Sequence, residues 1–142
     1  MRGMKRLSPA CLLCLALAGC FSDRSPRDVE RRFLDAYYLE VDQPAALKLA
    51  VGPAANRIQN EIADLAQARR EGLEGSPAHP HMSYRKLSDR PPPAPGQREV
   101  EYQLSIDSSG VTLQKLVDLV LEAQGGHWRV RNFAEVDAAH VD

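Results

Sequence analysis

The stretch EVEYQLSI, residues 99–106, decides the fold class because apolar and polar side chains alternate along it without a break. Its apolar members are Val100, Tyr102, Leu104 and Ile106. Successive side chains of a β-strand point to opposite faces, so this strand would bury one face and expose the other to water. Such alternation is typical of an antiparallel sheet that is packed on one side.

A second strand is expected after the turn at residues 107–110, DSSG. The apolar pattern of residues 111–124 fits a helix as well as a strand. Gly125 and Gly126 follow directly, and Trp128 and Val130 then alternate with arginines. Two apolar runs joined by two glycines predict a β-hairpin. We therefore predict a strand over 111–124, with a helix as the open alternative.

The residues before the central strand indicate a loop, a short strand and a rigid connection. Residues 74–80, EGSPAHP, have loop composition. A short alternation at Met82 and Tyr84 follows. Residues 90–96, RPPPAPG, lack most of the amide donors that a ladder needs, so they predict a stiff extended connection. A proline-recognition partner is a much weaker interpretation of this segment.

The first half of the chain is predicted to be helical. Ser25 and Pro26 are typical of a helix start, in which Ser25 would cap free amides. The apolar stripe of this first helix is Val29, Phe33, Ala36, Tyr37 and Val41. Asp42 would start a second short helix over 45–50, and a third helix would cover 53–73 with Ile58, Ile62 and Leu65 on one stripe.

Helices followed by a meander of strands predict an α+β fold, with N-terminal helices packed on a curved antiparallel sheet of three to four strands. The closing GGHWRV, residues 125–130, resembles the last hairpin of the nuclear transport factor two-like superfamily. Gly126, Trp128 and Val130 match that hairpin, whereas Gly125 stands where an acidic or polar residue is usual. The resemblance covers about residues 28–136 and implies a cone-like fold that can enclose a pocket. It implies no reaction, because this superfold hosts enzymes, binders and assembly modules.

The N-terminus has the pattern of an export signal. Residues 1–6 carry three positive charges and no acid, and a short apolar run follows to Leu17. That run is too short to span a bilayer, which takes about 20 residues. Residues 17–20, LAGC, resemble the lipobox of bacterial lipoproteins. We therefore predict a cleaved signal peptide over 1–19 and lipidation of Cys20.

Several expectations about location depend on that cleavage. Cys11 and Cys14 would be lost with the signal, which argues against a redox or metal pair. Residues 20–26 would form a lipidated tether, 27–136 the α+β domain and 137–142 a polar tail. Phe21, instead of Asp, follows Cys20 and favours the outer membrane, with the domain facing the periplasm. Two or three acyl chains make such anchoring stable.

Charge and length restrict the function classes. Without residues 1–19, the chain has 123 residues, with 15 Lys and Arg (18 less three) against 19 Asp and Glu, a net charge of −4. A domain of this size can bury one core. A mildly acidic chain without a basic stripe argues against nucleic acid as a partner and against extra electrostatic docking on anionic lipid.

The chain has no strong catalytic motif, so its catalytic residues are unknown and an enzyme is the less favoured interpretation. General acid–base work would need a carboxylate or His with a Tyr inside the cone. The candidates for such a role are Asp35, Tyr37, Tyr84, Tyr102 and Asp118. The side chains expected to line a core or a pocket are Phe33, Tyr37, Tyr84, Tyr102 and Trp128.

No metal site or cofactor is predicted. His79 and His81 lie in a predicted loop, and together with the distant His127 they could offer three imidazole ligands to zinc. No fourth ligand stands at a suitable spacing, so we interpret the pair as solvent-exposed loop residues. The expected function is a membrane-anchored, non-enzymatic domain that binds a small apolar ligand or an envelope protein through its concave face. The alternatives are an isomerase- or hydratase-type pocket enzyme and a homodimer that assembles through that face.

Overall fold

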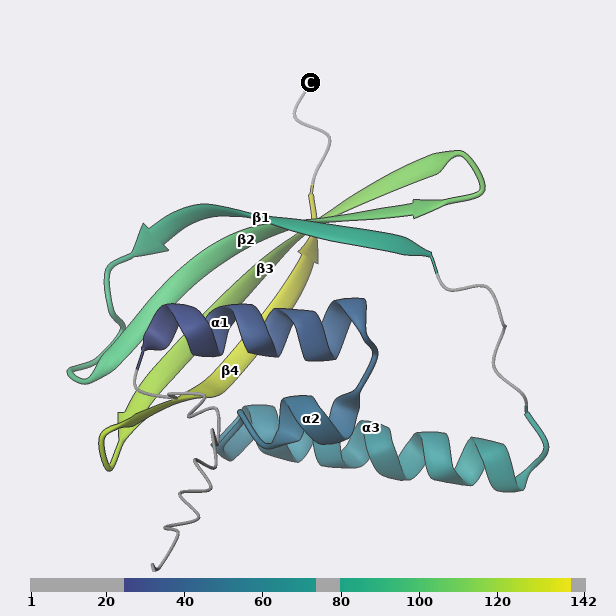
Figure 1. Ribbon diagram of the computed structural model, residues 1–142, viewed down its shortest axis with the longest axis horizontal. Coiled ribbons are helices and arrows are strands. Elements are labelled where there is room, and N and C mark those ends of the chain that lie inside the picture. The colour runs from purple at the N-terminus through teal and green to yellow at the C-terminus, as the bar shows by residue number, and fades with distance from the viewer. Residues whose placement is uncertain (1–24, 74–79, 139–142) are drawn as a thin grey trace, which may run out of the picture.

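The computed structural model describes residues 25–73 and 80–138 (Figure 1). The predicted signal peptide, Cys20, His79 and His140 lie outside the described residues. Four helical segments come first: α1 (Pro26–Leu34), the π-helix η1 (Asp35–Leu39) that continues it, α2 (Gln43–Leu47) and α3 (Gly52–Arg70). Four strands follow: β1 (His81–Arg90), β2 (Gln97–Ser108), β3 (Val111–Gln124) and β4 (His127–Asp137).

The four strands form one antiparallel sheet in the order β1-β2-β3-β4. Each strand is therefore hydrogen-bonded to its neighbour in the sequence, as in a meander. The predicted α+β class is confirmed, and residues 111–124 are a strand. The context of the Gly125–Gly126 turn, with φ of 55° and 81°, decides between helix and strand, because two residues of positive φ suit a tight hairpin.

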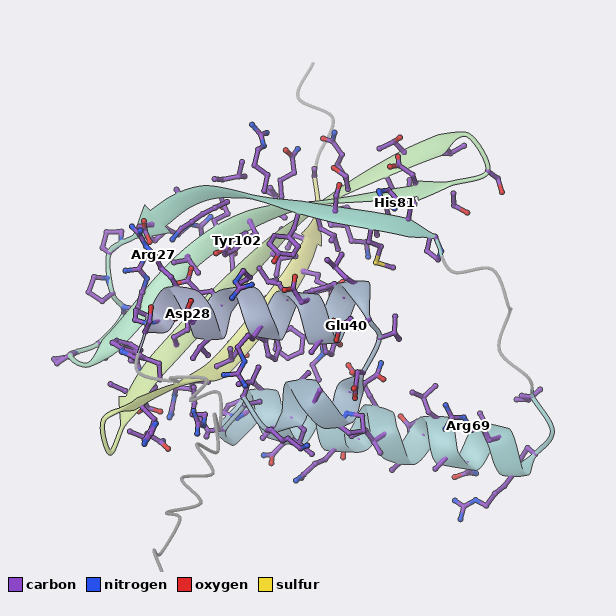
Figure 2. The ribbon with its side chains drawn as sticks, viewed as in Figure 1. Arg27, Asp28, Glu40, Arg69, His81 and Tyr102 are labelled. Atoms are coloured by element: carbon purple, nitrogen blue, oxygen red, sulfur yellow. The ribbon has the colours of Figure 1, made fainter. Side chains whose placement is uncertain are left out.

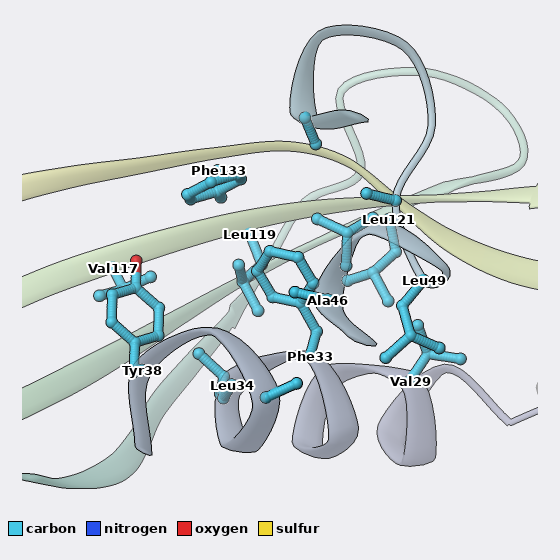
Figure 3. Close-up of a cluster of buried hydrophobic side chains, with 14 of the residues drawn as sticks. Val29, Phe33, Leu34, Tyr38, Ala46, Leu49, Val117, Leu119, Leu121 and Phe133 are labelled. Carbon is cyan, nitrogen blue, oxygen red and sulfur yellow. The ribbon is translucent and has the colours of Figure 1, made fainter. Parts of the chain in front are cut away.

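The core lies between the concave face of the sheet and α1, which crosses that face (Figures 1 and 3). Phe33 is fully buried and meets the ring of Phe133 edge-on, with ring centroids 5.2 Å apart. The other buried apolar side chains come from the helical half and from β2, β3 and β4: Val29, Leu34, Ala36, Tyr38, Ala46, Leu49, Ala50, Ala54, Ile58, Val100, Tyr102, Leu104, Val117, Leu119, Leu121 and Val130. Val100, Tyr102 and Leu104, which belong to the alternating pattern of residues 99–106, thus face this core.

The segment between α2 and α3 protects the edge of β4. The Val130 amide donates to the Leu49 carbonyl at 2.8 Å, and the Val51 amide donates to the Val130 carbonyl at 2.9 Å. These bonds pair backbone groups of an edge strand that would otherwise be free to pair with another chain.

Three details of the helical half differ from the prediction. Ser25 precedes α1 but makes no side-chain capping bond. Val41 does not belong to the first helical stripe, because the helix ends at Leu39 and Val41 has a φ of 53° and is 42% exposed. Both later helices end earlier than predicted, the second at Leu47 instead of residue 50 and the third at Arg70 instead of residue 73. The capping role of Asp42 is confirmed, since its carboxylate accepts from the Ala45 amide at 3.0 Å.

Among residues 25–73 and 80–138, no helix is long and apolar enough to cross a bilayer.

Candidate functional site

A charged residue, Glu30, lies inside the cone. It sits on the same face of α1 as Phe33 and Leu34, at helical spacings of three and four residues. Because that face packs on the sheet, Glu30 is only 1% exposed. Burial of a carboxylate is costly unless it is paired and hydrogen-bonded. Its partners therefore define the most unusual polar cluster of the described chain.

Three donors from the sheet satisfy the Glu30 carboxylate. The Tyr102 hydroxyl on β2 donates to Oε2 at 2.7 Å, and Lys86 Nζ on β1 lies 3.3 Å from the same oxygen. Arg98 Nε donates to Oε1 at 2.9 Å. Both oxygens are thus engaged within the protein. We call Glu30, Lys86, Asp89, Arg98 and Tyr102 the Glu30 cluster.

Asp89 completes the cluster at its solvent side. It contacts Lys86 Nζ at 2.9 Å and also pairs with the Arg98 guanidinium. The hydrogen bond from Lys86, with the nearby positive charge of Arg98, lowers the pKa of the Asp89 carboxyl. The two cations are therefore shared between a buried and an exposed carboxylate. Burial, and then the hydrogen bond to Glu30, raise the pKa of Tyr102, which keeps its proton at neutral pH.

A shallow pocket of about 280 Å³ adjoins the cluster. Arg98 and Asp89 belong to both. The pocket brings together the start of α1, the connection after β1 and the start of β4, and its lining residues are Pro26, Asp89, Arg90, Pro92, Gln97, Arg98 and Trp128. We call this region the tether-side pocket, because the chain enters the domain at Pro26.

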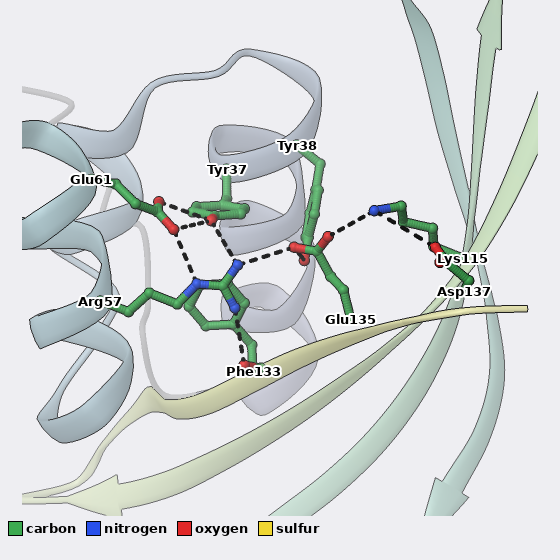
Figure 4. Close-up of polar contacts among 8 residues, drawn as sticks. All are labelled: Tyr37, Tyr38, Arg57, Glu61, Lys115, Phe133, Glu135 and Asp137. Atoms are coloured by element: carbon green, nitrogen blue, oxygen red, sulfur yellow. Dashed lines mark hydrogen bonds and ion pairs between the residues drawn. The ribbon is translucent and has the colours of Figure 1, made fainter. Parts of the chain in front are cut away.

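A second polar network lies where η1, α3 and β4 meet (Figure 4). Arg57 on α3 donates through Nε to Glu61 at 3.0 Å, and its Nη2 lies 3.3 Å from Glu135. The same guanidinium stacks over the Phe133 ring, 4.2 Å from its centroid. Lys115 on β3 extends the network, 3.6 Å from Glu135. The charges alternate in sign, so each is balanced by a neighbour.

Two adjacent tyrosines of η1 donate to carboxylates of this network. Tyr37 donates to Glu61 at 2.8 Å, and Tyr38 donates to Glu135 at 3.0 Å. Burial is the main cause that raises the pKa of both hydroxyls, and the neighbouring carboxylates raise it further. Both tyrosines therefore act as hydrogen-bond donors at neutral pH and not as acids.

The five side chains predicted to line a core or pocket are not gathered in one place. Phe33 is in the core, and Tyr37 is in the second polar network. Tyr102 belongs to the Glu30 cluster, and Tyr84 meets its ring edge-on at 5.8 Å. Trp128 alone of the five lines the tether-side pocket.

The predicted catalytic candidates are separated as well. Asp35 accepts from the Tyr84 hydroxyl at 2.6 Å, whereas Tyr37 faces Glu61, so residues two apart on this helix have different partners, as expected. Asp118 lies on the outer face of β3. Its Oδ1 is 3.3 Å from Arg90 Nη1 but has no hydrogen-bond partner among the described residues.

Glu30 was not among the candidates chosen from the sequence. The signal that could have found it is a charged residue on the apolar stripe of the first predicted helix, between Val29 and Phe33. His81 is the first residue of β1 and not a loop residue as predicted, and both His81 and His127 are exposed. Within the described parts of the chain, no group of three His, Cys, Asp or Glu side chains is arranged to hold a metal ion.

Comparison with solved structures identifies the fold. A designed nuclear transport factor two-like protein superposes with a TM-score of 0.52 and 15% sequence identity, over 78% of this chain and 95% of that one. The fold is nuclear transport factor two-like. The solution structure of a SEC-C motif containing protein from Rhodopseudomonas palustris is also similar to this chain, with a TM-score of 0.54 and 19% identity over 82% of each chain. No protein-family model matches the chain, and no curated protein sequence matches it.

Proposed function

We propose that this protein is a lipoprotein, lipidated at Cys20, that holds a non-enzymatic binding or assembly domain at a membrane surface outside the cytoplasm. The observation that carries the proposal is the position of the first helix. α1 begins at Pro26, six residues after Cys20 of the lipobox-like LAGC. The first described helix thus lies close in sequence to the point where the signal peptide would end, and the outer membrane is the favoured location.

The interior of the cone supports a binding or assembly role over catalysis. Both oxygens of Glu30 are engaged by Tyr102, Lys86 and Arg98. General acid–base catalysis requires a group that can reach the substrate with a free lone pair or proton. In the Glu30 cluster these groups are directed at one another, so the cluster is suited to holding α1 on the sheet.

The surface supports contact with another envelope component. Val111 and Leu113, two residues apart on one face of β3 beside the β2–β3 turn, are 59% and 57% exposed. Large apolar side chains that remain exposed in a group indicate an interaction surface. We propose that the partner bound there is an envelope protein.

The lipidation is tested by metabolic labelling with an alkyne analogue of palmitate in a bacterial host that processes lipoproteins. Cys20→Ser is expected to abolish labelling and to leave the uncleaved precursor. Cys14→Ser is the matched control, because that cysteine would leave with the signal peptide, and it should be labelled like the wild type. Undiminished labelling of Cys20→Ser would contradict the proposal.

One observation favours a second candidate function, a small-pocket isomerase or hydratase. The Glu30 and Tyr102 pair is the combination of carboxylate and phenol that such chemistry uses, and Arg98 links it to the tether-side pocket. Native mass spectrometry of the mature chain from the periplasm discriminates between the two. A reproducible added mass of small-molecule size would favour the enzyme, and an unliganded mass is expected for the binding domain.

A further inference from the structure

The end of the domain where α1 begins combines proline and tryptophan side chains. Pro26 at the start of α1, Pro92 in the β1–β2 connection and Trp128 at the start of β4 line the tether-side pocket together. Figure 1 shows these three segments at one end of the molecule, with the β2–β3 hairpin and the end of α3 at the other. We call the end with these three segments the tether end, and the opposite end the distal end.

The length of the tether restricts which end can touch the membrane. From Cys20 to Pro26 the chain can extend at most about 20 Å. The 12 residues of β2 run from the tether end to the distal turn, which corresponds to about 40 Å of strand. A lipid on Cys20 would thus hold the tether end at the bilayer, and the distal hairpin could approach only if the domain lay flat.

The side chains of the tether end suit a membrane surface. Trp128 is partly exposed, and indole rings are enriched at the level of lipid headgroups because they are apolar with one polar group. Pro92 lines the same pocket and is exposed, as are Pro91 and Pro93 on either side of it in the sequence. Proline has no backbone amide donor, so contact with the bilayer would cost these residues no hydrogen bond from an amide to water.

Guanidinium groups surround this apolar surface. Arg27 is exposed on α1, and Arg90 is 40% exposed while it pairs with Glu99, Glu101 and Asp118. Arg98, which pairs with Glu30 and Asp89, lies at the pocket wall. Arginine binds phosphate oxygens in a bidentate geometry. The net charge of −4 argues against adsorption of the whole surface, but the tertiary structure places these arginines at one end. Tethering also makes the contact intramolecular, so that a weak attraction is enough to maintain it.

We propose that the tether end, defined by Pro26, Arg27, Arg90, Pro92, Arg98 and Trp128, rests on the phospholipid headgroups of the bilayer that holds the lipidated Cys20. Trp128 lies at the headgroup level, and the distal hairpin with Leu113 points away from the membrane. This orientation rests on the proposed lipidation. It leaves the exposed apolar hairpin free to meet an envelope partner.

Trp128 is the single tryptophan of the chain, so its fluorescence reports on this end alone. The experiment uses the full mature lipoprotein reconstituted into vesicles of phosphatidylethanolamine and phosphatidylglycerol, with and without lipids brominated near the headgroup. Brominated lipid is expected to quench Trp128 at least about twofold more than a distal tryptophan. The distal probe is the variant Trp128→Phe with Leu113→Trp, whose indole replaces a side chain that is 57% exposed.

A matched pair of charge reversals tests the arginines. Figure 2 shows Arg27 at the start of α1 and Arg69 near the far end of α3, and both are exposed. Arg27→Glu is expected to reduce the quenching of Trp128, and Arg69→Glu is expected to leave it unchanged. Equal effects of the two reversals would overturn the role given to Arg27 and its neighbours.

The result separates this inference from the proposed lipidation. The intact mass of the purified chain shows whether the diacylglyceryl group is present, and flotation shows whether the chain is on the vesicles. A chain without lipid would overturn both proposals. A lipidated, floating chain whose Trp128 is quenched no more than the Leu113→Trp probe would overturn the orientation and leave the lipidation in place.

Discussion

The Tyr102 hydroxyl on β2 donates a 2.7 Å hydrogen bond to Glu30 on α1, 72 residues away in the sequence. Both residues are buried. The bond joins α1 to β2 across the concave face of the sheet. Its acceptor is a carboxylate oxygen that also contacts Lys86, and such acceptors make the stronger hydrogen bonds of proteins.

Tyr102→Phe should destabilise the domain by about 1.5–3 kcal/mol, the range for a hydrogen bond to a charged group. The ring and its packing remain, but a buried oxygen of Glu30 loses a donor. The free energy of unfolding in urea measures this cost. Tyr84→Phe is the control: its hydroxyl bonds Asp35 at a partly exposed site, so a smaller loss is expected. Equal losses for the two variants would contradict the special role of the Glu30 cluster.

Phe33→Ala should cost about 3–5 kcal/mol, because it removes a fully buried aromatic ring and leaves a cavity. Phe33 lies in contact with the rings of Tyr37 and Phe133. Leu113→Ala, on the exposed hairpin, should change the stability by no more than about 0.5 kcal/mol. Thermal or urea unfolding checks both, and a tolerant Phe33 would show that α1 is not packed on the sheet as described.

The stability should fall as the pH rises above about 10, the pKa of an ordinary tyrosine in an unfolded chain. Burial raises the pKa of Tyr38 and Tyr102 in the folded state, so the unfolded chain releases their protons first. The unfolded state then binds fewer protons, and the free energy of unfolding decreases by up to about 1.4 kcal/mol per pH unit for each tyrosine. Below the unfolded pKa these two groups contribute no pH dependence.

The measurement is urea unfolding as a function of pH on the alkaline side, where lysines also titrate. The double variant Tyr38→Phe with Tyr102→Phe removes the two phenols and keeps the lysines. Its stability should decline less steeply with pH than that of the wild type. Parallel declines would mean that the tyrosines do not carry the effect.

Gly125→Asn should preserve or increase stability, by up to about 1 kcal/mol. Gly125 has a φ of 55° and an added Cβ would meet nothing within 4 Å. Asparagine tolerates this left-handed conformation, and Asn-Gly is the preferred pair of a tight hairpin turn. Gly125→Val is the contrasting variant and should destabilise, because a β-branched residue is strained there. Unfolding midpoints of the two variants provide the check.

The strands could be predicted because short sequence patterns specify them. Alternation along residues 99–106 and the two glycines after residue 124 each specify a structure within a few residues. The predictions were wrong where a local sequence pattern disagreed with the direction that the chain takes in the tertiary structure. Val41 continued the helical spacing in the sequence, but the chain turns after Leu39 to place α2 against η1 and α3, and Val41 takes a positive φ.

The candidate site was predicted less well, since its residues are far apart in the sequence. Tyr102 and Trp128 were chosen as candidates, yet they lie in different places, one in the Glu30 cluster and one in the tether-side pocket. Glu30 was missed because one acidic residue in a helix rich in Arg and Asp does not stand out. Its spacing of three and four residues from Phe33 and Leu34 places it on the face of α1 that packs on the sheet.

The sequence by itself determined the fold class and the order of the elements, and it contains the export and lipidation signal that we propose. These are encoded by spacing, turn residues and charge over short windows, which need no tertiary contact to be recognised. Tertiary structure decided which polar residues are buried together and which end of the domain carries Trp128 with the arginines. Those properties depend on the packing of α1 across the sheet and on strand register, which bring Glu30, Lys86, Arg98 and Tyr102 together from positions up to 72 residues apart.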